Sequence, residues 1–238
     1  MKTTDSIHKT EEFRKYFRSQ VIPSYYSGLL HLLFSGTVLI GGSIFCLKHL
    51  NNVSNSEWLL VPIMILVGNL AIYCIHKYPL HRRIPLMKFA YKIHTLDHHS
   101  FFTEDNLVYD SMRDFYILLF PPFVVIFVGF FVGPLFGFIV AKLWSTNAGL
   151  LVCFGHYIYF VLYEIFHYVS HLPKDHFVMK FYPFAYMREH HKRHHTMSLM
   201  SHYNFNVVFP LCDKIFGSFY TQNKAAKISR INSYEKNA

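Results

Sequence analysis

Four long apolar stretches, separated by polar segments, dominate the sequence. Each is at least 18 residues long, and they comprise residues 25–47, 58–75, 115–141 and 148–166. A helix needs about 20 apolar residues to cross the hydrocarbon core of a bilayer. The pattern therefore predicts an all-α integral membrane protein with four transmembrane helices. Pro121, Pro122 and Pro134 lie within the third stretch and are expected to kink or interrupt that helix.

The polar segments carry an uneven positive charge. If the four spans alternate in direction, 21 of the 23 lysines and arginines lie on the side that holds both termini, and only Lys48 and Lys142 lie on the other. Lysine and arginine are enriched in cytoplasmic loops. Both termini are therefore predicted to be cytoplasmic, in a bacterial inner membrane or an endoplasmic reticulum membrane.

The composition agrees with a membrane protein and argues against a nucleic-acid partner. Hydrophobic residues make up 52% of the chain and charged residues only 16%, whereas soluble domains average about 25% charged residues. The formal net charge is +9, but the basic residues flank the spans and form no separate basic domain. This placement favours attraction to anionic lipid headgroups over binding of a phosphate backbone.

The chain is predicted to have three parts. Residues 1–24 carry aromatic side chains at helical spacing with basic side chains on the opposite side, which predicts a cytoplasmic segment lying in the membrane interface, with a solvated tail as the alternative. Residues 25–220 are predicted to form the membrane domain, with a helical cytoplasmic cap made of residues 76–114 and 167–220. Residues 221–238 are predicted to be a flexible tail.

Histidine is unusually frequent and clustered. The chain has 17 histidines, and 12 of them lie within residues 76–99, 167–171 and 190–202. All three windows fall at, or just beyond, the predicted cytoplasmic ends of spans. Imidazole is the commonest metal ligand in proteins, so the clusters predict a metal site in the cap.

The spacing within each window predicts which imidazoles share an ion. Residues three or four apart on a helix lie on one face, which predicts the pairs His94/His98, His167/His171, His191/His194 and His191/His195. Adjacent residues diverge by about 100°, so His98 and His99, like His194 and His195, are predicted to serve different metals. Pro79 is expected to break the helix between His76 and His81 and to turn His81 back toward the site.

The predicted ligand set has ten members, which is too many for one ion and therefore predicts two metals. The set is His76, His81, His94, His98, His99, His167, His171, His191, His194 and His195. His190 and His202 are additional candidate ligands. Imidazole binds iron, zinc, copper and nickel, so the ligand type alone does not select the ion.

The four histidine motifs also carry a family resemblance. HKYPLH, HTLDHH, HYVSH and HHKRHH, interleaved with four spans, resemble the boxes of the fatty acid hydroxylase superfamily, membrane di-iron enzymes that include sterol desaturases and sphingolipid fatty acid hydroxylases. The similarity covers roughly residues 59–220. Downstream, NFNVVFPLCDKIFGSF resembles the closing motif of the family and contains Asn204. Asn206 and Cys212 depart from it, since glycine and tryptophan are common there.

The resemblance implies a cofactor, a reaction and partners. It implies two iron ions that activate the co-substrate O2 and hydroxylate the acyl chain of a lipid or fatty acid, with desaturation as the alternative. Zinc has no redox chemistry, so iron must be the working metal even where zinc replaces it in purified protein. The sequence contains neither an HPGG nor a GxGxxG motif. A separate electron donor, either cytochrome b5-like or a ferredoxin with its reductase, is therefore expected.

Three polar residues are candidates to support the ligands. Glu164 lies where the hydroxylase branch often has an acid, and it is predicted either to accept a hydrogen bond from the ring of a ligand or to pair with a basic residue. Asp97 has the same two alternatives, and Asn204 is the third candidate. Two other functions stay open: a histidine-rich metal transporter, which would hold ligands near the bilayer midplane, and a non-catalytic lipid or metal sensor.

Overall fold

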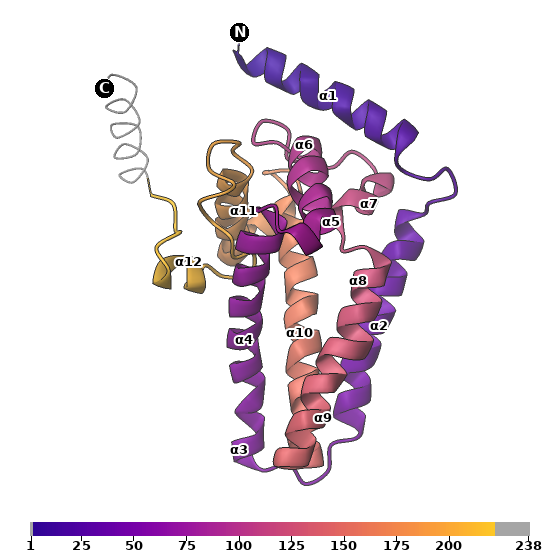
Figure 1. Ribbon diagram of the computed structural model, residues 1–238, viewed down its shortest axis with the longest axis vertical. Helices are drawn as coiled ribbons and strands as arrows, with labels where there is room; N and C mark the ends of the chain where they lie inside the picture. The colour runs from indigo at the N-terminus through magenta and orange to yellow at the C-terminus, as the bar shows by residue number, and fades with distance from the viewer. Residues whose placement is uncertain (1, 222–238) are drawn as a thin grey trace.

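The computed structural model describes residues 2–221, so nearly all of the predicted tail lies outside the described residues. The described residues form helices and no strand. Four helical segments are long and apolar enough to cross a membrane, which confirms the predicted fold class (Figure 1). They are Gly28–Lys48, Asn55–Leu80, Pro122–Leu143 and Thr146–Ser170.

Two of the four segments are continuous helices, and two combine several elements. The continuous helices are α2 (Gly28–Lys48) and α10 (Thr146–Ser170). The second segment comprises α3 (Asn55–Trp58), α4 (Leu60–Ile75) and the π-helix η1 (His76–Leu80). The third comprises α8 (Pro122–Phe127), the π-helix η5 (Val128–Val132) and α9 (Gly133–Leu143).

The third segment begins later than the sequence pattern predicts. Phe115–Leu118 forms a separate short helix, α7, and the chain becomes extended at Leu119 before α8 begins. Pro121 and Pro122 cause this break because neither has a backbone N–H to continue a helix. Phe115 and Leu118 are buried, so the first turn of the predicted span belongs to the cap.

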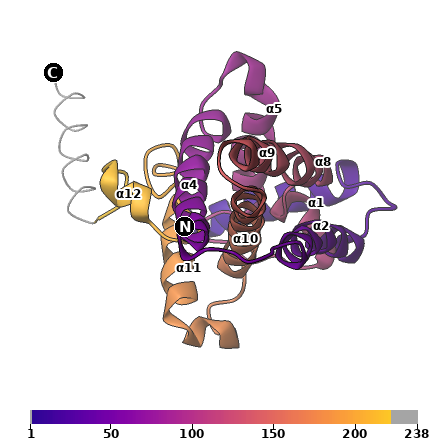
Figure 2. The same ribbon diagram turned by 90° about the horizontal axis from the view of Figure 1, so that it is seen from below.

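Helix α10 is the central helix of the bundle. Half of its most apolar window is buried inside the protein, against 17–28% for the other three segments. Both views place α10 among α2, α4 and α9 (Figures 1 and 2). Gly149 lets α10 approach α9 closely, since a Cβ at this position would collide with the carbonyl oxygen of Gly137. The central position of α10 carries His167 and His171 to the middle of one end of the bundle.

The cap is built from short elements at that end of the bundle (Figure 1). After η1 come η2 (Pro85–Met87), α5 (Lys88–Tyr91), the π-helix η3 (Lys92–His98), α6 (His99–Phe101) and η4 (Met112–Asp114). After α10 come η6 (Phe177–Lys180), α11 (Tyr182–His194) and α12 (Leu211–Ile215).

Helix α1 (Lys2–Gln20) lies across the cap on the side away from the spans (Figure 1). Its Arg14 is fully buried and donates to the carbonyl oxygens of Phe101 and Asn106, 2.7 and 2.8 Å away. Arg18 forms an ion pair with the buried Asp114 at 2.8 Å. The predicted interfacial segment is thus a helix docked on the cap, because carbonyl and carboxylate oxygens of the cap bind its guanidinium groups.

Candidate metal centre

Two π-helical turns set the orientation of four histidines. In a π-helix the backbone hydrogen bonds run from i to i+5, so residues five apart lie on one face. His76 begins η1 and His81 directly follows it, with ring centroids 5.0 Å apart. His94 lies in η3 and His99 directly follows it, with ring centroids 4.8 Å apart. Pro79 lies inside η1 instead of ending the helix.

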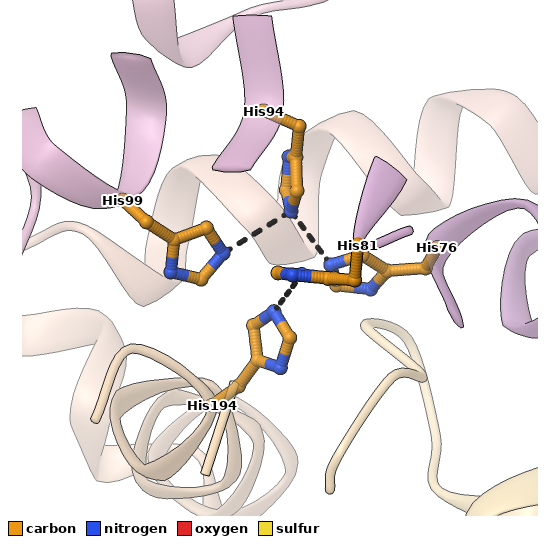
Figure 3. Close-up of side chains that lie close together, drawn as sticks. All are labelled: His76, His81, His94, His99 and His194. Carbon is orange, nitrogen blue, oxygen red and sulfur yellow. Dashed lines mark hydrogen bonds between the residues drawn. The ribbon is translucent and has the colours of Figure 1, made fainter. Parts of the chain in front are cut away.

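The histidines converge in two groups of buried side chains. Within each group, one ring nitrogen of every member lies within 4.8 Å of those of all the others. The first group is His76, His81, His94, His99 and His194, and the second is His98, His171, His191 and His195. Figure 3 shows the first group with its rings turned toward a common centre.

The division between the groups follows the adjacent pairs and departs from two of the helical pairs. His98 and His99 enter different groups, as expected of neighbouring residues on a helix. His94 and His98 are also divided, because the π-helix pairs His94 with His99 instead. The predicted sharing of an ion by His191 and His194 is likewise not seen, whereas His191 and His195 lie together.

His167, the tenth predicted ligand, belongs to neither group but lies beside the second. Its ring centroid lies 5.0 Å from those of His98, His171 and His191, which are members of the second group. Its Nε2 atom is buried and has no hydrogen-bond partner. His167 therefore stands beside the second group with a nitrogen free for a ligand bond.

The two additional candidates, His190 and His202, belong to neither group. His190 is buried, but its Nε2 lies 3.1 Å from Oδ2 of Asp213, a carboxylate that also accepts from the backbone N–H groups of Phe205 and Asn206. His202 is exposed, in the turn after α11. The structure thus separates both residues from the ten that converge.

The partners of the ring Nδ1 atoms determine which ring nitrogen is protonated. A backbone carbonyl oxygen has no proton, so Nδ1 must donate to it, and Nε2 of the neutral ring is then unprotonated. Five rings hold Nδ1 at 2.5–3.0 Å from a carbonyl oxygen: His76 (Phe205), His98 (Ile117), His171 (Leu107), His194 (Tyr203) and His195 (Phe102).

Thr95 gives His81 the same protonation state. Its hydroxyl donates to the carbonyl oxygen of Leu80 at 2.5 Å, so it accepts from Nδ1 of His81 at 3.1 Å. The Nε2 atoms of His81 and His194 are therefore both unprotonated, yet they lie 3.0 Å apart (Figure 3). Two lone pairs at this distance repel each other unless a cation binds them. This pair of atoms is the clearest sign that the site fits a metal.

Burial keeps the imidazoles in the neutral form that a metal requires. Removal from water, with the neighbouring imidazoles as a second cause, lowers the pKa of His81 to about 2. Burial also lowers the pKa of His98 to about 4. The same two causes hold the pKa well below the usual value for His94, His99, His171, His191, His194 and His195.

An apolar cavity of about 370 Å³ adjoins both groups. His94 of the first group, His98 of the second and the neighbouring His167 form part of its wall. The remaining wall is almost entirely hydrophobic and includes Leu80, Ile93, Ile117, Leu118, Phe120, Val124 and Tyr163. A cavity of this size and polarity can enclose a segment of a hydrocarbon chain beside the imidazoles.

A comparison with protein families agrees with this arrangement. The model of the family described as fatty acid hydroxylase matches residues 61–218, about two thirds of the chain. The chain belongs to the fatty acid hydroxylase family. Its matched region includes all ten converging histidines and the wall of the cavity. No curated protein and no solved structure matches the chain.

The three residues predicted to support the ligands make their hydrogen bonds outside the two histidine groups. Glu164 is half-buried and accepts a hydrogen bond from the backbone N–H of Phe120 at 3.1 Å. Within residues 2–221 it makes no hydrogen bond to a ligand ring and no ion pair with a basic residue. Its Oε2 atom has no partner. Asp97 forms an ion pair with Lys92 at 2.7 Å.

The remaining support comes from Asn204, Thr95 and the backbone. Asn204 donates to the carbonyl oxygen of His190 at 3.0 Å and accepts from the N–H of Tyr220 at 2.9 Å, so it joins α11 to the last described residues. Sequence reasoning missed Thr95, although its place directly after His94 in the second histidine box was a weak signal. The five carbonyl oxygens that hold Nδ1 atoms leave no signal in the sequence.

Proposed function

We propose that the protein is a membrane-bound di-iron oxygenase that hydroxylates the acyl chain of a lipid or fatty acid, using O2 and electrons from a separate donor. The observation that supports this most strongly is the apolar cavity beside two groups of neutral imidazoles. Iron bound by the two groups would supply the O2 chemistry needed to attack an unreactive C–H bond.

The ten histidines would hold the iron ions, with five around each if His167 joins the second group. Nitrogen donors of this kind suit iron. Zinc would fit the same donors but has no redox chemistry, so zinc in purified protein would mark an inactive form. The carbonyl oxygens and Thr95 would orient the rings, as partners of the free ring N–H do in other metal sites.

The wall of the cavity would position the acyl chain and exclude water. Ile117 and Leu118 of α7 and Tyr163 of α10 line the cavity next to His98 and His167. Their apolar surface favours a hydrocarbon chain over water through the hydrophobic effect. A dry site also protects a reactive oxidant from side reactions.

The location of the site fits delivery of substrate and electrons from different sides. The histidines lie at one end of the bundle, where the cap stands beyond the spans (Figure 1). An acyl chain would enter from the bilayer, and a cytochrome b5-like protein or a ferredoxin with its reductase would approach the cap. We propose that this end and both termini face the cytoplasm, in a bacterial inner membrane or an endoplasmic reticulum membrane.

The same site would serve a desaturase, whereas a transporter fits it poorly. A transporter would place its ligands near the midplane of the bilayer, but both histidine groups lie at the cap end of the bundle.

Mass spectrometry of lipids tests the proposal. Cells that express the wild-type protein are compared with cells that express His194→Ala, and His49→Ala is the control because His49 is exposed at the end of α2, far from both groups. Gain of one oxygen atom in a lipid, present with wild type and His49→Ala but absent with His194→Ala, supports a hydroxylase. Loss of two hydrogen atoms would move the protein to the desaturases. A lipid change that survives His194→Ala would refute the role of the histidines.

A further inference from the structure

The mouth of the cavity is formed by an exposed apolar segment that we call the lip, residues 82–89. Leu86, Met87 and Phe89 line the cavity, yet Leu86 is 98% exposed and Phe89 is 59% exposed. Residues that line the cavity and also face outward place its opening at the lip. In the view along the bundle, α5 projects sideways beyond the spans (Figure 2). The cavity thus opens toward the surroundings of the bundle.

The apolar part of the lip is flanked by three exposed cations, Arg82, Arg83 and Lys88. Within residues 2–221, none of the three forms an ion pair with a carboxylate. The guanidinium carbon of Arg82 lies 5.2 Å from the ring centroid of Tyr78, and that of Arg83 lies 5.7 Å from the ring centroid of Tyr91. These cation–π contacts leave the N–H donors of both arginines available to an anion.

Acidic side chains are missing from both sides of the mouth. The sequence has no aspartate or glutamate between Glu57 and Asp97, which covers the lip, and none between Asp114 and Glu164, which covers α7 and α8 on the opposite wall. Glu164 itself is half-buried and accepts from the Phe120 backbone N–H. An anion that approaches the lip would therefore meet these cations, and neither of the two segments offers a competing carboxylate.

We propose that Arg82 and Arg83, with Lys88, bind the anionic headgroup of the lipid whose acyl chain enters the cavity. The protein would then select acyl lipids with a net negative headgroup over zwitterionic lipids with the same chains. Arginine suits this role because its planar guanidinium binds phosphate and carboxylate oxygens through two parallel hydrogen bonds. The part of the inference that concerns the acyl chain rests on the proposed function, whereas the headgroup site stands on the lip alone.

The test measures lipid binding without O2 or reductant, so it is independent of turnover. Purified full-length protein is mixed with dioleoyl phosphatidylglycerol or dioleoyl phosphatidylcholine, and one-to-one complexes are counted by native mass spectrometry. Wild type is expected to retain phosphatidylglycerol at least about tenfold better. R82Q/R83Q is expected to lose that preference, since each charge-assisted hydrogen bond contributes enough to change affinity by about tenfold.

The matched control is K48Q/K142Q, which removes the same charge at the opposite end of the spans and should retain the preference. Ala90 lines the cavity beside the lip. Ala90→Trp should fill part of the cavity and weaken the binding of both lipids if the acyl chain lies there. Thermal unfolding and metal content show whether each variant is folded.

Three results would overturn the proposal. The first is equal retention of the two lipids by wild type. The second is a loss of the preference for phosphatidylglycerol in K48Q/K142Q as large as that in R82Q/R83Q. The third is competition by glycerol phosphate as strong as that by the lipid, which would indicate a site for free phosphate. Selective retention of phosphatidylglycerol without any lipid oxidation in cells would refute the proposed function and leave the headgroup site intact. Lipid oxidation in cells without selective retention of phosphatidylglycerol would refute the headgroup site and leave the proposed function intact.

Discussion

The two histidine groups both bring buried imidazoles together, but they do so through different backbone geometry. The first group takes four of its members from the π-helical turns η1 and η3 and the residues that directly follow them, His81 and His99. The second group takes most of its members from the ends of α10 and α11, where ordinary α-helical spacing applies. The first group therefore depends on the local π-helical geometry of η1 and η3, whereas the second depends mainly on how α10 and α11 pack.

The largest effect is expected from variants that remove one ligand from either histidine group. His194→Ala removes a member of the first group and His98→Ala a member of the second, so each variant should lose bound metal together with more than about 99% of lipid-modifying activity. Metal content per chain and lipid mass spectrometry measure the two losses. His49→Ala should change neither, and equal behaviour of all three variants would contradict the ligand assignment.

The next effect concerns only the first group. Thr95→Val removes the hydroxyl that accepts from Nδ1 of His81, so metal affinity at the first group should fall by about 10- to 100-fold, as for other partners of ligand rings. Thr95→Ser keeps the hydroxyl and should restore most of the affinity. Metal titration of the apo-protein measures both variants. Metal binding by Thr95→Val equal to that of wild type would contradict the protonation state assigned to His81.

A smaller effect is expected at the cavity, which adjoins both groups. Val124 of α8 lines the cavity without contributing to either group, so Val124→Phe should narrow the space for the acyl chain. We expect kcat/KM for a long-chain lipid to fall by about tenfold, in line with the effect of small changes in the size of an apolar pocket. Metal content should stay at the wild-type level, and a parallel loss of metal would show that the change disturbs the histidines instead.

The smallest effect is expected at Glu164, which supports the break between α7 and α8. Glu164→Gln keeps an oxygen acceptor for the Phe120 N–H and should leave metal content unchanged. Glu164→Leu leaves that buried N–H unpaired, which should lower the free energy of unfolding by about 1–3 kcal/mol. Thermal unfolding compares the two variants, and loss of metal in Glu164→Gln would give the carboxylate a direct role at the centre.

The sequence predicted the parts of the structure that depend on composition and spacing. Four apolar stretches were sufficient to predict the four spans. His98 and His99, which are predicted to serve different metals, lie in different groups. The predicted start of the third span lies too early because the apolar pattern continues through Phe115–Leu118. Two prolines separate that turn from α8.

The errors at the site have a different origin. Spacing rules for an α-helix paired His94 with His98, and nothing in the residue types reveals that this turn is a π-helix. His190 satisfied the spacing but binds Asp213, a residue 23 positions away that only the fold brings near. The carbonyl oxygens that orient the rings belong to the backbone, which every residue shares.

The central claim is that the two histidine groups each hold one iron ion. Anomalous scattering at the iron edge, measured on crystals of the iron-loaded protein, tests it most directly. The account predicts two peaks, one among His76, His81, His94, His99 and His194 and one among His98, His167, His171, His191 and His195. A single peak, or a peak at His190 or His202, would contradict it.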